Sequence, residues 1–208
     1  MPEVLSAALL TLKDIHQNLK MEPCWDSRFE EYLVLKPLPE HQEQELLKIR
    51  ADFLPYLESG TVSEGTIKLL LLAPLLKLTG FYQEPFHIDV EESIGQILEA
   101  DEEMTIRGRM DILITKKQMK PIFWILIIEA KKLSLSVQVG LAQLLAYLYK
   151  GLQNQSQVWG LVTNGFEYQF ILAEKRQPII YHLMPLLNLL ETEKLKQILQ
   201  VLNGIREQ

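Results

Sequence analysis

An uninterrupted apolar run, Ile122 to Ile128, ends directly in Glu129, Ala130 and Lys131. The run is seven residues long and rich in isoleucine and aromatic side chains. Such a short, β-rich run predicts a buried strand, because a bilayer span needs about 20 apolar residues. The sheet of this chain must therefore accommodate an acid and a base at the end of a buried strand.

The chain has 208 residues, of which 48% are hydrophobic and 23% charged. This composition is typical of a globular protein, and the length allows one domain with a small appendage. The single cysteine, Cys24, cannot form an internal disulfide, which favours a reducing, cytoplasmic location. An acidic residue at Glu3 argues against a signal peptide, and the longest apolar stretches are too short to span a bilayer.

The charges are distributed unevenly along the chain. The net charge of -6 argues weakly against a protein that coats nucleic acid by bulk electrostatics. Residues 84–103 contain eight acids and no lysine or arginine, whereas residues 105–150 contain eight bases and two acids. Solvated hairpin and helix faces would explain such runs equally well. The two acids in the basic segment are Asp111 and Glu129, and both lie on apolar runs.

Helical spacing of apolar residues and capping signals predict several helices. Ser63 is a suitable N-cap with an acid in the following turn, Pro74 should bend the helix that follows, and Gly80 is a suitable stop. The predicted helices span Val4–Leu19, His41–Leu57, Glu64–Thr79 and Ser136–Leu152.

Alternating and β-branched runs predict the strands. Asn164-Gly165 is a strong hairpin signal between two of them. The predicted strands lie in Pro85–Ser93, Gly108–Thr115 and Pro121–Lys132, and on both sides of that turn within Gln157–Glu174. We expect an α/β sandwich with a central mixed sheet flanked by helices, in which residues 1–60 form a helical N-terminal extension packed on a core of residues 61–208.

The end of the apolar strand has the side chains for phosphodiester chemistry. Because side chains alternate along a strand, Glu129 and Lys131 should face the same side. Asp111 lies on the preceding strand and can come within about 5 Å of a cross-strand neighbour. Two carboxylates at one buried site repel each other unless a cation neutralises them, and Mg²⁺ takes one or two carboxylates. An ammonium beside such an ion can orient a water and offset charge in the transition state.

These residues resemble the D…(D/E)-x-K signature of the PD-(D/E)XK nuclease superfamily, over about Ser63 to Glu174. Asp111 ends "GRMD", which is similar to a G-x-x-D first motif, although Met110 replaces the usual proline. "EAK" (Glu129 to Lys131) supplies the second motif, and "QLLAY" (Gln143 to Tyr147) is similar to the Q-x-x-x-Y motif of related nucleases. "TNG" (163–165) is similar to a segment in the N-terminal nuclease domain of type I restriction enzyme motor subunits.

The resemblance implies a restriction endonuclease-like fold and a metal-dependent nuclease, with DNA the expected substrate. Asp111, Glu129 and the carbonyl of Ala130 would hold Mg²⁺, or Mn²⁺ in its place. Glu64, on the helix before the sheet, would bind the same or a second ion, with Glu102 and Glu103 as alternatives for this acid.

The remaining roles follow from the same resemblance. Lys131 would position the attacking water, Gln143 would fix the water or a phosphate, and Tyr147 would support the helix. Phosphate contacts, and hence salt-dependent but sequence-tolerant binding, would come from Arg107, Arg109, Lys116, Lys117, Lys120 and Lys132.

Other interpretations remain open on the sequence alone. Each motif taken singly has a structural explanation, since ion pairs at strand ends and polar pairs on helices are common. A non-catalytic nucleic-acid-binding or assembly module on the same fold is the alternative function. An interaction protein that uses its helical ends, such as Met184 to Ile205, is a third, and a homodimer or a separate specificity partner is compatible with the nuclease.

Overall fold

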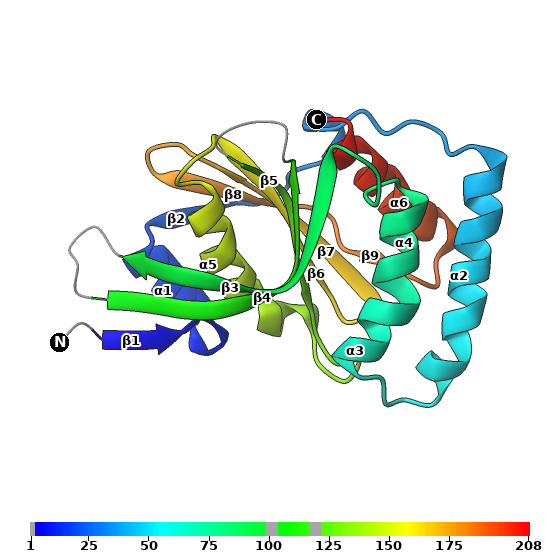
Figure 1. The fold of residues 1–208 in the computed structure, drawn as a ribbon, viewed down its shortest axis with the longest axis horizontal. Coiled ribbons are helices and arrows are strands. Elements are labelled where there is room, and N and C mark those ends of the chain that lie inside the picture. The colour runs from blue at the N-terminus through cyan, green and yellow to red at the C-terminus, as the bar shows by residue number, and fades with distance from the viewer. Residues whose placement is uncertain (1–2, 99–103, 117–121) are drawn as a thin grey trace.

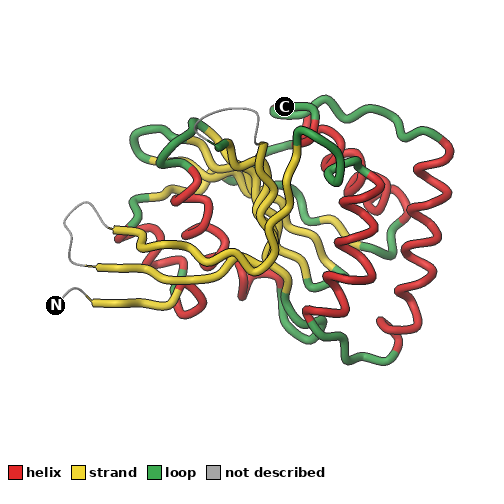
Figure 2. The backbone as a smooth tube through the Cα atoms, viewed as in Figure 1, coloured by secondary structure: helices red, strands yellow, loops and turns green. Residues whose placement is uncertain are grey.

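A mixed, nine-stranded sheet lies between two groups of helices in the computed structural model, which describes residues 3–98, 104–116 and 122–208 (Figures 1 and 2). The fold class is therefore α/β, as predicted. The strands are β1 (Glu3–Ser6), β2 (Met21–Cys24), β3 (Phe86–Leu98), β4 (Met104–Lys116), β5 (Phe123–Ala130), β6 (Gln157–Thr163), β7 (Glu167–Glu174), β8 (Ile179–Leu183) and β9 (Leu187–Asn188). The α-helices are α1 (Leu12–Asn18), α2 (Glu40–Glu58), α3 (Glu64–Ile67), α4 (Ala73–Leu78), α5 (Leu141–Gly151) and α6 (Thr192–Arg206).

The sheet runs in the order β1-β4-β5-β6-β7-β8-β2, with β3 on β4 and β9 on β7. The pairs β1/β4, β5/β6 and β2/β8 are parallel, and the other pairs are antiparallel. The crossover from β5 to the parallel β6 contains α5, as parallel neighbours require. Because β5 lies inside the sheet, between β4 and β6, its end that carries Glu129 has a neighbouring strand on each side.

Each face of the sheet has its own hydrophobic core. On one face, α2, the α3–α4 segment and α6 contribute core side chains such as Phe53, Leu71 and Ile198. On the other face, α1 and α5 contribute core side chains such as Ile15 and Leu145. Figure 1 shows these two groups of helices on opposite sides of the strands. The arrangement is a three-layer sandwich of the kind that buries both faces of a sheet.

The helix predicted from Glu64 is confirmed, but it is not uniform. The Ser63 side chain accepts a hydrogen bond from the Thr66 N–H, which caps the start of α3. A π-helical segment, Lys68–Leu72, then joins α3 to α4. The Ala73 N–H donates a hydrogen bond to the carbonyl of Lys68, five residues earlier, and Pro74 follows with no N–H to donate. This wider turn replaces the simple bend that Pro74 predicts.

The N-terminal prediction is wrong in part. Residues predicted as one helix over Val4–Leu19 form β1, a short 3₁₀ turn and α1. Thr11 and Asp14 form a capping box that starts α1 late, and β1 pairs with β4 instead of continuing a helix. β1 and β2 thus belong to the central sheet, while the division of the chain at residue 60 remains a prediction. The helix α2 and the strands β3 to β7 agree with the predicted elements.

A buried histidine fixes the chain just after β2. His182 on β8 contacts the Ser27 hydroxyl and the Tyr32 hydroxyl at its Nδ1, at 3.0 Å each. Its Nε2 lies 2.9 Å from the Glu174 carboxylate. These contacts hold the segment after β2 against the far edge of the sheet.

No helix in the described part of the chain is both long and apolar enough to cross a membrane.

Candidate active site

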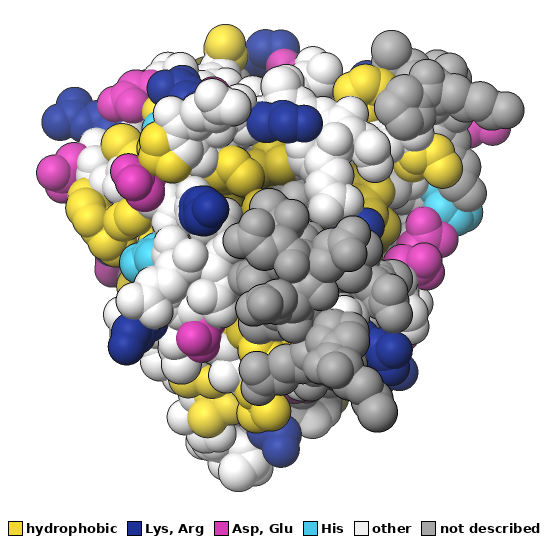
Figure 3. All heavy atoms as spheres, turned by 90° about the vertical axis from the view of Figure 1, so that its left-hand side faces the viewer, with side chains coloured by type: hydrophobic (Ala, Val, Ile, Leu, Met, Phe, Trp, Pro, Cys, Tyr) yellow, Lys and Arg dark blue, Asp and Glu magenta, His cyan; other side chains and the backbone are white. Residues whose placement is uncertain are grey.

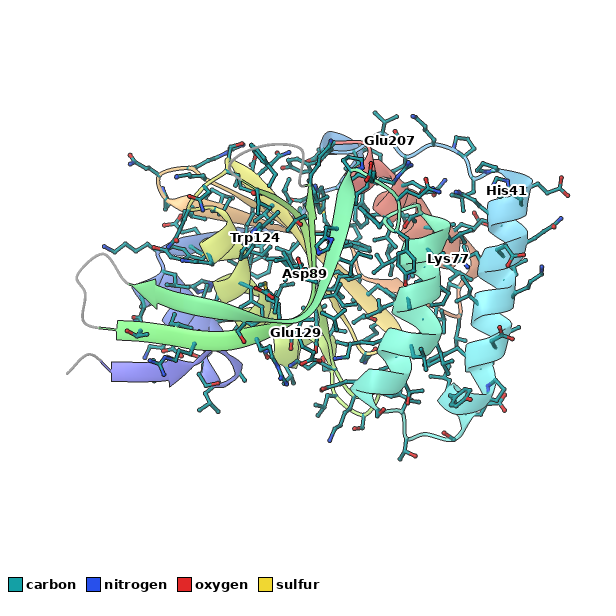
Figure 4. All side chains as sticks on the ribbon, viewed as in Figure 1. His41, Lys77, Asp89, Trp124, Glu129 and Glu207 are labelled. Atoms are coloured by element: carbon teal, nitrogen blue, oxygen red, sulfur yellow. The ribbon has the colours of Figure 1, made fainter. Side chains whose placement is uncertain are left out.

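Asp111 and Glu129 face each other on neighbouring strands. Ile112 of β4 pairs with Ile128 of the antiparallel β5, so the same register puts Asp111 opposite Glu129. The Asp111 Oδ2 accepts a hydrogen bond of 2.8 Å from the N–H of Ala130. The structure therefore brings together the two acids and the Ala130 backbone. Figure 4 labels Glu129 near the middle of the molecule, where β3 and β4 bend.

A chain of hydrogen bonds leads from Glu129 into α5. The Lys131 ammonium donates to Glu129 Oε1 at 2.8 Å and to Gln143 Oε1 at 2.9 Å. The Gln143 amide donates to the Tyr147 hydroxyl at 2.8 Å, which donates to the Arg109 carbonyl at 3.1 Å. Gln143 and Tyr147, which the sequence singled out by their spacing, thus connect the Lys131 ammonium to the backbone of β4.

Two glycines make room for this network. A Cβ on Gly108 would lie 2.8 Å from the Tyr147 ring and hydroxyl, and 2.9 Å from the Ala7 Cβ. A Cβ on Gly140 would lie 2.9 Å from the Lys131 Cε. Both distances are too short for carbon atoms at van der Waals contact. The glycine of "GRMD" is therefore required by the position of Tyr147.

Glu129 is buried with half of its carboxylate unpaired. The residue is 3% exposed, and its Oε2 has no hydrogen-bond partner among the described residues. Burial and then the Asp111 carboxylate raise the pKa of Glu129 to about 7, against the opposing effect of the Lys131 ammonium. Burial likewise raises the pKa of Tyr147 to about 12, so this hydroxyl stays neutral. Glu129 is the group whose charge state this site controls most strongly.

The site contains a second lysine ammonium, which the sequence alone did not reveal. Lys68, from the π-helical segment, donates to Asp111 Oδ1 at 2.9 Å and to Glu91 Oε1 at 2.5 Å. Burial lowers the pKa of Lys68, but the hydrogen bonds to Glu91 and Asp111 outweigh it and raise the pKa overall. Arg109 contacts the other oxygen of Glu91 at 2.8 Å. Lys68 lies one helical turn after Glu64 in the sequence, and this spacing is the signal from which Lys68 could have been assigned to the site.

Glu91 has an unusual backbone for a strand residue. Its φ of 59° lies in the left-handed region, inside β3. Non-glycine residues seldom adopt this conformation, and such outliers concentrate at functional sites. Figure 1 shows that β3 and β4 bend sharply along their length. The conformation of Glu91 turns its carboxylate toward Lys68 and Arg109.

Glu64 lies close enough to act on the site electrostatically. It is half-buried in the first turn of α3, and its charge adds to the raised pKa of Glu129. No hydrogen bond between Glu64 and Asp111 or Glu129 occurs among the described residues. The alternative acids, Glu102 and Glu103, lie outside the described residues.

The predicted phosphate-binding residues are dispersed. Arg107 is exposed, Arg109 is paired with Glu91, and Lys116 lies over the Phe86 ring at 5.9 Å. Lys132 is exposed next to the site, whereas Lys117 and Lys120 lie outside the described residues. On the face drawn in Figure 3, basic and acidic side chains are interspersed.

The residues present fit a divalent ion held by two carboxylates. Within residues 3–98, 104–116 and 122–208, no group of three or more His, Cys, Asp and Glu side chains is placed to hold a metal. Mg²⁺, however, commonly takes one or two carboxylates and keeps several waters. Asp111 and Glu129 supply two, and the unpaired Glu129 Oε2 is a buried acceptor that a cation would satisfy.

No protein-family model matches this chain, and no curated protein is significantly similar to it.

Proposed function

We propose that this chain is a metal-dependent nuclease of the PD-(D/E)XK type, with a restriction endonuclease-like sandwich, that hydrolyses phosphodiester bonds in DNA. The observation that carries the proposal is the contact of Lys131 with Glu129, opposite Asp111, while the buried Glu129 Oε2 has no hydrogen-bond partner in the described part of the chain. A module without chemistry has no need to keep two like charges together at this cost.

Each side chain of the site has its own role in the proposed hydrolysis. Asp111 and Glu129, with the Ala130 carbonyl, would hold Mg²⁺ or Mn²⁺, and Glu64 would complete the site directly or through water. A bound Mg²⁺ would polarise the phosphate and lower the pKa of an attacking water.

Lys131 supplies the positive charge beside the reacting phosphate. Its ammonium is held between Glu129 and Gln143, so it is oriented before substrate binds. From there it positions the attacking water and offsets the charge that builds on the phosphoryl oxygens. Gln143 is itself held by Tyr147, which makes the helix residues supports for the lysine.

Binding would depend on the phosphate backbone. Arg107, Arg109 and Lys132 are exposed on or next to the strands that carry the acids. Contacts to phosphates give affinity that falls with salt and reads no sequence. A second copy or a separate protein would therefore supply any specificity. The single cysteine supports a reducing, cytoplasmic location for this nuclease.

The test is cleavage of supercoiled plasmid at low salt with Mg²⁺ or Mn²⁺. We expect nicking by the wild type, a loss of at least about 100-fold in Asp111→Asn and Lys131→Met, and full activity in Lys48→Met. Lys48 is a suitable control because it forms an exposed ion pair with Glu45 on α2. Equal cleavage by wild type and Lys131→Met would overturn the assigned roles.

A non-catalytic nucleic-acid-binding module is the second candidate, and one observation favours it. Lys68 and Lys131 each form an ion pair with one of the two acids. If plasmid stays intact and calorimetry detects no Mg²⁺ or Mn²⁺ binding, the paired lysines are structural; retention of the uncut plasmid by the protein in a gel-shift assay would then support this second function.

A further inference from the structure

A pocket of about 610 Å³ lies between the α3–α4 segment and β3. Its volume falls within the roughly 300–1,000 Å³ of small-molecule sites. The walls are mainly apolar and aromatic, formed in part by Leu69, Leu76, Phe81, Tyr82, Phe86 and Val90. Figure 1 shows α3 and α4 beside the part of β3 that borders the pocket.

This pocket borders the candidate active site. Lys68 and Glu91 line it, and the same Lys68 ammonium contacts Asp111 Oδ1. Gly65 lines it too, directly after Glu64 in the sequence. A phosphodiester bond held at Asp111 would therefore have a neighbouring nucleoside at the mouth of the pocket.

The pocket combines aromatic and apolar surface with nearby ammonium groups. Tyr82 is 54% exposed and Val90 is 59% exposed, so both offer free apolar surface. The Lys116 ammonium lies over the ring of Phe86, which lines the pocket, at 5.9 Å from the ring centroid. Lys68 in the lining and Lys116 beside it thus supply positive charge for the phosphates next to a stacked base.

We propose that this pocket binds an unpaired nucleobase next to the bond that is cut. Bases in a duplex are stacked and paired inside the helix, so only a single-stranded or flipped base can enter. This inference rests on the proposed nuclease function and deepens it. The preferred substrate is then single-stranded DNA, or DNA with unpaired nucleotides at the cleavage position.

The test separates base binding from backbone binding. Two fluorescein-labelled probes of equal length and charge are compared by anisotropy in EDTA, where no strand is cut: oligo(dT) and an oligomer of abasic deoxyribose phosphates. We expect the wild type to bind oligo(dT) about tenfold more tightly, since stacking one base is worth roughly that factor. Tyr82→Ala should lose this advantage and bind the abasic probe as the wild type does.

Two further variants control the experiment. Tyr56→Ala removes another exposed tyrosine, 46% exposed on α2, and should bind both probes like the wild type. Val90→Glu places a carboxylate in the pocket and should weaken oligo(dT) binding as Tyr82→Ala does. Melting temperatures verify that each variant is folded.

The outcomes distinguish the two proposals. Equal wild-type affinity for both probes, with no effect of Tyr82→Ala, would overturn the base pocket and leave the nuclease proposal to the plasmid assay. A Tyr82→Ala variant that is folded but weakens both probes equally would also overturn the base pocket. Failure of the wild type to bind either probe would overturn the base pocket as well, while plasmid cleavage with Mg²⁺ or Mn²⁺ remains the separate test of the nuclease proposal.

Discussion

Asp111 accepts a hydrogen bond of 2.8 Å from the backbone N–H of Ala130, so the strand that carries Glu129 also fixes the opposing acid. Its second oxygen contacts Lys68, so protein groups bind both carboxylate oxygens. Asp111 therefore has a structural role that can be separated from its proposed chemical one.

Replacing Asp111 by asparagine or by leucine should separate these roles. Asparagine can still accept the Ala130 hydrogen bond, whereas leucine leaves that N–H unpaired. We expect Asp111→Leu to be less stable than Asp111→Asn by roughly 1–3 kcal/mol in urea unfolding. Both should lack cleavage activity. Equal stabilities would show that the Ala130 hydrogen bond contributes nothing measurable.

The stability of the metal-free protein should depend on the ionisation of Glu129. Its pKa is raised to about 7 in the folded state, from an ordinary value of 4.5. Between these values the folded protein binds a proton that the unfolded chain releases, so stability falls as pH rises toward about 7. The loss amounts to roughly 3 kcal/mol and is complete above the folded pKa.

Glu129→Gln should remove this pH dependence. Urea unfolding in EDTA, at several pH values between 5 and 8, measures the free energy of unfolding of both proteins. We expect the difference between wild type and variant to shift in favour of the variant as pH rises. Parallel profiles would show that Glu129 does not titrate in this range.

Substituting Gly108 should disturb the helix side of the site. Gly108→Ala places a methyl group 2.8 Å from the Tyr147 ring, and we expect a cost of about 1–3 kcal/mol together with reduced cleavage. Gly65→Ala is the matched control for stability, since the nearest atom to its Cβ is the Ser63 hydroxyl at 3.8 Å. That helical position should gain stability from alanine.

Removing Lys68 should make the protein more responsive to divalent ions. Lys68→Met leaves Asp111 and Glu91 without their shared ammonium, which we expect to lower stability in EDTA by roughly 1–3 kcal/mol. Added Mn²⁺ should then raise the melting temperature more in the variant than in the wild type, because the ion replaces the lost charge. Lys48→Met should respond to Mn²⁺ like the wild type; the same response in Lys68→Met would contradict the prediction.

The parts of the site that follow from strand geometry could be predicted from the sequence. Alternation along β5 puts Glu129 and Lys131 on one face, and helical spacing puts Gln143 and Tyr147 one turn apart. The contribution of Lys68 depends on how the α3–α4 segment packs against β3, and the backbone of Glu91 depends on the bend of that strand. Neither depends on local spacing alone.

The N-terminal strands were missed for a related reason. β1 and β2 have four residues each; the apolar residues of β1 fit the helical pattern predicted over Val4–Leu19, and the four residues of β2, which include Pro23, are too few to show a strand pattern. What decides their structure is pairing with β4 and β8, which come much later in the chain. Local propensity is weak where tertiary pairing dominates.

The placement of β1 and β2 at the two ends of the sheet order also sets a sequence of events during synthesis. Both strands are made before their partners: β1 can pair once residues 104–107 of β4 have been made, but β2 cannot pair until residues 179–182 of β8 have been made. At about 5–20 residues per second, the wait of β2 lasts on the order of ten seconds. A strand made early therefore joins the sheet late, and its free edge needs protection from other partners until then.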